Sequence, residues 1–135
     1  MIITIPISVG ELLDKISILS IKSQYTDNSY VHKELQDLIK IAQEHQVYDA
    51  PYVSQLLSVN RKLWKIEDDL RVLEKLKTFN EEFIELARSV YITNDLRASI
   101  KKQINEKYKS SYQEVKCYVW NPWEWMWTLI SFEDK

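Results

Sequence analysis

Glycine, proline and cysteine are scarce in this chain of 135 residues, which has one glycine, three prolines and one cysteine. With Gly10 as the only glycine, most glycine-based signatures are excluded, the phosphate-binding loop among them. So few turn residues favour long helices over an all-β fold with many turns. The single cysteine, Cys117, excludes an intrachain disulfide and a cysteine-based metal cage, so we expect a cytoplasmic protein.

The chain also lacks an excess of one charge and any long apolar run. Its 18 basic and 20 acidic residues give a net charge of −2, which provides no general attraction to nucleic acid. No apolar run approaches the roughly 20 residues of a membrane span, and the N-terminal residues lack the basic start of a secretory signal. His32 and His45 have no carboxylate or cysteine at ligand spacing, so we expect neither a metal site nor a cofactor.

Hydrophobic periodicity predicts helices over residues 9–24, 30–45 and 52–77. Ser8 and Glu11 fit a capping box at the start of the first helix. The third helix has the most regular pattern, in which apolar residues alternate at spacings of three and four, as in an antiparallel bundle. These residues are Leu56, Val59, Leu63, Ile66, Leu70 and Leu73.

A fourth helix is expected over residues 80–108, joined to the third by a tight turn, so that the two form an antiparallel hairpin. Its inward stripe becomes polar in the middle, where Asn94, Arg97 and Lys101 replace the usual leucines. A guanidinium directed toward a core needs a partner, because an unpaired buried charge is very costly. That partner is either another helix of the protein or a ligand.

In such a hairpin, residues equally distant from the turn face each other, which predicts one polar band across both helices. Glu67 is the expected counter-charge of Arg97 or Arg88. Arginine side chains offer forked donors, so the expected ligand is a small anion with a phosphate or carboxylate group. The candidate ligand-binding residues are Lys15, Lys22, Asn60, Glu67, Arg88, Tyr91, Asn94 and Arg97. The alternative is an internal salt-bridge network, neutralised by the carboxylates of Glu11, Asp14, Glu67 and Asp95.

Both ends of the chain alternate between apolar and polar residues, over residues 1–7 and 114–120, which predicts a small β-sheet built from the two ends. The expected fold is therefore mainly α, an antiparallel bundle of about four helices with this sheet, in a single domain. Residues 1–120 would form its core, and residues 121–135 a tryptophan-rich tail whose pattern fits either a helix or a strand.

The tail has too much aromatic surface to remain in contact with water. It either packs on its own bundle or forms contacts between copies of the chain, and we expect a homo-oligomer. The candidate interface residues are Trp120, Trp123, Trp125, Met126, Trp127 and Ile130.

Three segments resemble the signature blocks of an uncharacterised bacterial and phage family, known only as a domain of unknown function. They are residues 10–22 (GELLDKISILSIK), 62–71 (KLWKIEDDLR) and 85–105 (ELARSVYITNDLRASIKKQIN). The resemblance extends from the N-terminus to about Tyr118 and does not include the tail. It implies a small, mostly helical domain and no mechanism.

Three functional hypotheses remain open, and we favour a binding or accessory module. The second is a homo-oligomeric interaction protein. The third is a small helical enzyme similar to chorismate mutase, which works by positioning and electrostatics, or to nucleotide pyrophosphohydrolases, with magnesium held by Glu11 with Asp14 and by Glu82 with Glu85. A thermal-shift panel of small anions separates a ligand site from a structural network.

Overall fold

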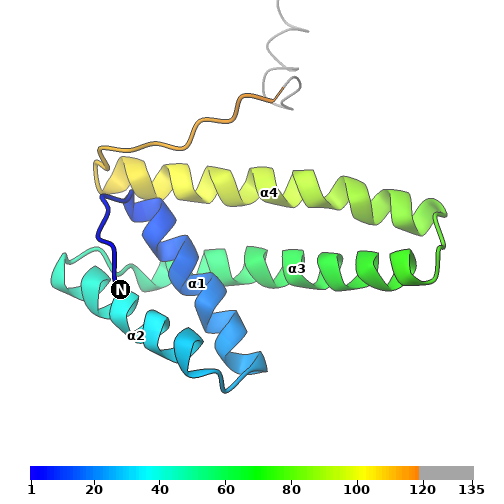
Figure 1. The fold of residues 1–135 in the computed structure, drawn as a ribbon. Helices are drawn as coiled ribbons and strands as arrows, with labels where there is room; N and C mark the ends of the chain where they lie inside the picture. The colour runs from blue at the N-terminus through cyan, green and yellow to red at the C-terminus, as the bar shows by residue number, and fades with distance from the viewer. Residues whose placement is uncertain (119–135) are drawn as a thin grey trace, which may run out of the picture.

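The computed structural model describes residues 1–118, and this part of the chain folds into four helices. In chain order they are α1 (Val9–Tyr25), α2 (Ser29–Glu44), α3 (Ala50–Lys75) and α4 (Glu81–Lys107). α3 and α4 form a long antiparallel hairpin, α1 crosses one half of this hairpin, and α2 packs against α1 (Figure 1). The four predicted helices and the hairpin are confirmed, with small differences at the helix ends.

Side-chain caps define where the helices begin. The Ser8 side chain accepts a hydrogen bond from the Glu11 amide at 3.1 Å, and Asn80 accepts one from the Phe83 amide at 3.1 Å. Asp49 caps α3 in the same way, by accepting from the Tyr52 amide at 3.2 Å. Each cap satisfies one of the first-turn amides that have no partner within the helix.

Three helices end on a residue with a positive φ angle that is not glycine. Gln46 has φ 56°, Lys77 has φ 53° and Lys109 has φ 54°. In each case the next amide donates to a carbonyl five residues before it, as in a Schellman motif; Val47, for example, donates to Ala42 at 2.9 Å. The left-handed conformation costs roughly 1–2 kcal/mol for a residue with a Cβ, so these ends are strained.

Replacing Gln46 with glycine is therefore expected to stabilise the protein by about 0.5–1 kcal/mol, because glycine adopts this φ without steric cost. Urea unfolding followed by circular dichroism measures the change. The matched control is Gln36→Gly in the middle of α2, which is expected to destabilise by about 1 kcal/mol. Equal effects of the two substitutions would show that Gln46 is not strained.

The hydrophobic core lies where α1 covers the hairpin. Its most deeply buried side chains include Leu13, Ile16, Leu56 and Ile104. Along the α3 seam, Leu56, Val59, Leu63 and Ile66 are buried, whereas Leu70 and Leu73 are only half-buried. Burial decreases along the seam because α1 crosses only one half of the hairpin (Figure 1). Among residues 1–118, no third helix packs against the far half of the hairpin.

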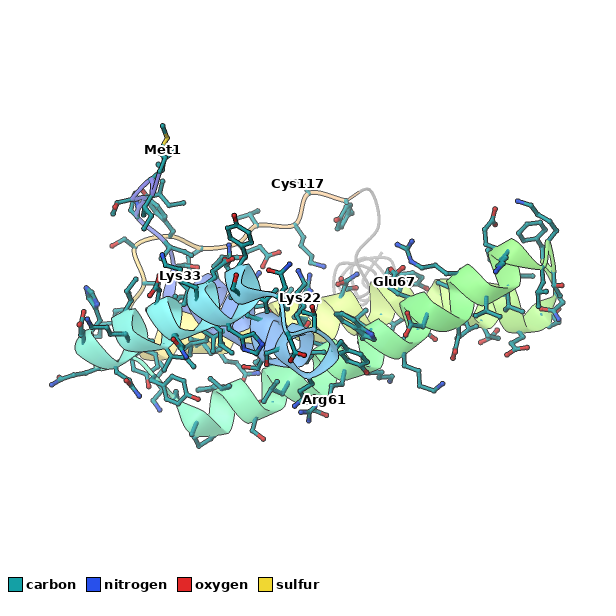
Figure 2. All side chains as sticks on the ribbon, turned by 60° about the horizontal axis from the view of Figure 1, so that its bottom comes forward. Met1, Lys22, Lys33, Arg61, Glu67 and Cys117 are labelled. Atoms are coloured by element: carbon teal, nitrogen blue, oxygen red, sulfur yellow. The ribbon has the colours of Figure 1, made fainter. Side chains whose placement is uncertain are left out.

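The predicted β-sheet is wrong, because residues 1–118 contain no strand. Residues 1–7 are exposed throughout, and Ile2, Ile3 and Ile5 face solvent. The segment of residues 110–118 lies along α4 instead of pairing with the N-terminus, and Figure 2 shows Met1 and Cys117 at separate places. Alternation predicts which side chains share a face, but an isolated pair of short strands has marginal stability without a surface to cover. Residues 119–120 of the second predicted strand lie outside the described part.

Candidate functional site

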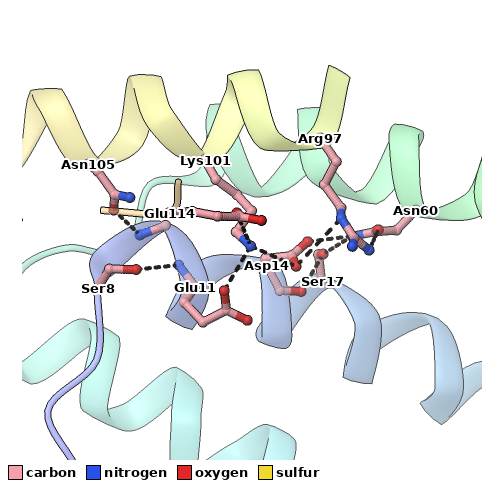
Figure 3. A network of polar contacts seen from close by, with 10 residues as sticks. Ser8, Glu11, Asp14, Ser17, Asn60, Arg97, Lys101, Asn105 and Glu114 are labelled. Carbon is pink, nitrogen blue, oxygen red and sulfur yellow. Dashed lines mark hydrogen bonds and ion pairs between the residues drawn. The ribbon is translucent and has the colours of Figure 1, made fainter. Parts of the chain in front are cut away.

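A cluster of polar side chains lies where α1 crosses the hairpin (Figure 3). Asp14 and Ser17 are three residues apart, which places them on one face of α1, and both are buried. α3 contributes Asn60, and α4 contributes Arg97 and Lys101. We call this cluster the crossing network, and it consists of Glu11, Asp14, Ser17, Asn60, Arg97, Lys101 and Glu114.

Asn60 links the two sides of the crossing network. Its Nδ2 donates to Asp14 Oδ1 at 2.9 Å and to Ser17 Oγ at 2.7 Å. Its Oδ1 accepts a hydrogen bond from Arg97 Nη1 at 3.3 Å. Arg97 Nε lies 4.0 Å from Asp14 Oδ2. The Asn60 amide thus holds a carboxylate on one side and a guanidinium on the other, which fixes the position of the Arg97 head group.

Lys101 is the most buried cation of the network, with a side chain that is 6% exposed. Its Nζ lies 2.8 Å from Glu11 Oε2, 2.7 Å from Glu114 Oε2 and 4.0 Å from Asp14 Oδ2. Burial disfavours the charged amine, but the surrounding carboxylates outweigh this effect and raise the pKa of Lys101 above its ordinary value. Lys101 is therefore charged and forms ion pairs with Glu11 of α1 and with Glu114 of the segment after α4.

Asp14 is the acid of the crossing network with the least access to water, with a side chain that is 4% exposed. Burial raises the pKa of Asp14 above its ordinary value, although the Asn60 hydrogen bond and the charges of Arg97 and Lys101 favour the ionised form. No buried side-chain nitrogen or oxygen among the described residues lacks a hydrogen-bond partner. The buried polar atoms of the network are thus paired within the described chain, as a stable buried polar cluster requires.

The start of α1 touches the end of α4. The Gly10 amide donates to Asn105 Oδ1 at 2.7 Å, and the Val9 amide donates to Ser110 Oγ at 2.8 Å. A Cβ added at Gly10 would lie 2.7 Å from the Lys101 carbonyl oxygen. The only glycine of the chain therefore permits a close contact between two helices, and this contact places Glu11 and Asp14 beside Lys101.

An open hollow of about 640 Å³ lies between α4 and the segment of residues 110–118. Lys116 Nζ lies 2.9 Å from Asp95 Oδ1, which attaches the segment to α4 at this point. Arg97 belongs both to the crossing network and to the wall of the hollow. The lining residues are Val90, Tyr91, Asn94, Asp95, Arg97, Ala98, Glu114, Lys116 and Tyr118.

The structure brings together Asn60 and Arg97, as the hairpin geometry predicts. Glu67, however, is not the counter-charge of Arg97 or Arg88. Glu67 is exposed and lies 3.8 Å from Arg71 one turn away, whereas the carboxylate beside Arg97 is Asp14. The prediction considered the two hairpin helices alone, but the acid comes from α1, which inserts its own polar face against them.

The other candidate ligand-binding residues separate into two groups. Tyr91 and Asn94 line the hollow beside Arg97. Arg88 pairs with Glu85 at 3.4 Å on the surface of α4. Lys15 pairs with Glu34 of α2 at 2.8 Å, and Lys22 is exposed. The predicted band thus divides into a site around Arg97 and several surface charges.

Sequence reasoning did not single out Ser17, Lys116 or Glu114 as parts of a site. Asp14 and Ser17 offered one signal, because two polar residues at a spacing of three interrupt the inward residues of α1. Glu114 offered none, since its contact with Lys101 depends on the path of the chain after α4.

The hypothesis of a magnesium site meets no supporting geometry in the described part of the chain. Residues 1–118 contain no group of at least three His, Cys, Asp or Glu side chains that could hold a metal ion. Glu11 and Asp14 contact Lys101, and Glu85 contacts Arg88.

The candidate interface residues of the tail lie outside the described residues, so the homo-oligomer stays a prediction. Among the described helices, none has the length and apolarity to cross a membrane.

Comparisons with known proteins identify a family for this chain but no function. No curated protein and no solved structure matches the chain. A family model, described as a family of unknown function (DUF6165), matches residues 3–123, which include all four helices and the segment beside α4. The chain therefore belongs to this family of unknown function.

Proposed function

We propose that this protein is a helical binding module that holds a small anion, with a phosphate or carboxylate group, in the hollow between α4 and residues 110–118. The observation that supports the proposal most strongly is the position of Arg97. Its guanidinium is fixed from behind by Asn60 and Asp14, while the same side chain is 30% exposed and lines the hollow.

A guanidinium has five N–H donors in a planar fork. The hydrogen bond to Asn60 uses one of them, so donors of Arg97 are available to a ligand in the hollow. The fork matches two oxygens of a phosphate or carboxylate. Because Asn60 and Asp14 already hold the head group in place, the Arg97 side chain would lose less conformational entropy when a ligand binds.

The remaining walls of the hollow suit a small polar molecule with one anionic end. Asn94 offers an amide beside Arg97, and Tyr91 and Tyr118 offer aromatic faces. Lys116 adds a second cation, paired with Asp95. The hollow is thus lined by two cations, Arg97 and Lys116, and two carboxylates, Asp95 and Glu114. Aromatic faces with a few polar groups are common in ligand pockets.

The competing explanation is that Arg97 serves only to stabilise the fold. Asp14, Asn60 and Arg97 are mutually paired in the described structure. Ion-pair networks of this kind imitate functional sites, so ligand binding has to be measured directly.

The test is a titration with inorganic phosphate and with a small dicarboxylate at constant ionic strength, followed by thermal unfolding and calorimetry. An anion at a hundredfold excess over its Kd is expected to stabilise the protein by about 2.7 kcal/mol. The variant Arg97→Gln is expected to lose this effect. The matched control, Arg88→Gln, removes an exposed arginine of the same helix and is expected to retain it.

Two results would contradict the proposal. One is the absence of a response to either anion in the unmodified protein. The other is an equal response in Arg97→Gln and Arg88→Gln, which would place any binding away from the hollow.

A further inference from the structure

We infer that Glu114 occupies the anion position beside Lys101 as an internal substitute for the ligand, and that ligand binding displaces Glu114 from Lys101 and shifts residues 110–118 relative to α4. This inference rests on the proposed function and adds a means of regulation to it. It also assigns Lys101 as a second cationic anchor, which Glu114 covers in the present structure.

The segment that contains Glu114 is attached to the helices mainly by side chains. Ser110 accepts a hydrogen bond from the Val9 amide at 2.8 Å, Glu114 pairs with Lys101 and Lys116 pairs with Asp95. Residues 111–118 are exposed apart from the half-buried Lys116, and they form no strand. When Glu114 leaves, Lys101 keeps Glu11 as a carboxylate partner at 2.8 Å, so release of this segment does not leave a buried cation unpaired.

The charges of the crossing network show which carboxylate can be replaced. Arg97 and Lys101 face three carboxylates, those of Glu11, Asp14 and Glu114. Without Glu114, two cations face two carboxylates. The charge of one anionic ligand group can therefore take the place of Glu114 and leave the total charge of the network unchanged.

Access distinguishes Glu114 from the other two acids. Asp14 has a side chain that is 4% exposed and is held by Asn60, so it cannot leave. Glu11 lies within α1, where its backbone is fixed. Glu114 is 42% exposed, lies outside any helix and lines the hollow together with Arg97. Among these three acids, Glu114 alone combines a backbone outside any helix with a place in the proposed ligand site.

An internal competitor lowers the apparent affinity by the fraction of molecules in which it is released. If Glu114 is released in about one molecule in ten, its removal lowers the apparent Kd roughly tenfold. The variant Glu114→Gln keeps the shape of the side chain and removes its charge. We therefore expect Glu114→Gln to bind inorganic phosphate about tenfold more tightly than the unmodified protein.

Cys117 provides an independent readout of displacement. It is exposed, is the only cysteine of the chain, and follows Glu114 by three residues. A fluorescent maleimide on Cys117 is expected to change its emission anisotropy as phosphate is added to the unmodified protein. In Glu114→Gln the anisotropy is expected to be close to the phosphate-bound value before any addition.

The experiment compares phosphate titrations of the unmodified full chain, Glu114→Gln and Glu106→Gln, by calorimetry and by the Cys117 label. Glu106 is exposed on α4 and is not part of the crossing network, so its replacement controls for the change in net charge. Tighter binding by Glu114→Gln alone, with the label response described above, supports the inference. It is also supported if phosphate binding is measurable only in Glu114→Gln.

The other outcomes separate the two proposals. If the unmodified protein binds phosphate through Arg97 but Glu114→Gln binds no more tightly than Glu106→Gln, the inference is overturned and the proposed function stands. If the label does not respond while phosphate binds, displacement of the segment is overturned. If neither the unmodified protein nor Glu114→Gln binds phosphate or the dicarboxylate, both proposals fail.

Discussion

Replacing Gly10 with alanine is expected to destabilise the protein by about 2–4 kcal/mol. The added Cβ would lie 2.7 Å from the Lys101 carbonyl oxygen and 2.8 Å from Asn105 Oδ1. The carbonyl belongs to the α4 backbone, so the clash cannot be relieved by a side-chain rotation, and overpacking of this kind costs about 1–3 kcal/mol. Separation of the helices would also weaken the hydrogen bond from the Gly10 amide to Asn105, worth about 1 kcal/mol.

The sign of the effect makes this a sharp test. At an unconstrained helical position, glycine to alanine stabilises by roughly 1 kcal/mol. Chemical unfolding of Gly10→Ala, Asn105→Ala and the double variant measures the coupling between the two positions. We expect the two substitutions to be non-additive, because both disturb the same contact. A stabilised Gly10→Ala variant would mean that α1 and α4 do not approach each other this closely.

Replacing Lys101 with methionine is expected to destabilise by about 3 kcal/mol. The substitution keeps an apolar stem of similar length but leaves the carboxylates of Glu11, Asp14 and Glu114 without their shared cation. Removal of one partner from a buried ion pair typically costs about 3–5 kcal/mol. We expect the lower end of this range, because Glu11 and Glu114 are partly exposed and can turn toward water.

The matched control is Lys102→Met, an exposed neighbour on α4 that is expected to change stability by no more than about 0.5 kcal/mol. Equal free energies of unfolding for Lys101→Met and Lys102→Met would show that the ion pairs of Lys101 do not stabilise the protein.

The pH dependence of stability gives a second readout for Lys101. Its raised pKa means that its stabilising effect is fully present below its ordinary pKa of 10.5 and is lost as the pH rises through the folded-state value. Lys107 and Tyr108 also have raised pKa values, through their hydrogen bonds to Asp49. Lys101→Met is therefore expected to show a shallower alkaline decline than the unmodified protein, not a flat one.

Much of the fold was predictable because it depends on local chemistry. Caps such as Ser8 and Asn80, and the alternating seam of α3, specify helices from residues that are close in sequence. The short connection between α3 and α4 then leaves an antiparallel hairpin as the only compact arrangement of the two helices. The contact between Asn60 and Arg97 followed from this hairpin alone.

The predictions failed where the outcome depends on a partner distant in sequence. The alternation in residues 1–7 specifies a possible strand face, but no surface in the described chain pairs with it. The hairpin geometry predicts Glu67 level with Tyr91, one turn from Arg88. Glu67 nevertheless lies near Arg71, and the carboxylate beside Arg97 is that of Asp14 from α1. The alternation in residues 114–120 predicts a strand, and it does not indicate that this segment brings Glu114 to Lys101.

By itself, the sequence determined the four helices, their caps, the α3–α4 hairpin and the presence of a polar interruption in the middle of α4. Only the tertiary structure decided where Lys101 lies, which acid neutralises Arg97 and which residues enclose the hollow beside Arg97. The physical reason is the separation along the sequence of the residues that interact. Helix formation depends on neighbours within a few residues, whereas the crossing of α1 over the hairpin depends on how closely two backbones can approach, and here a single glycine permits that approach.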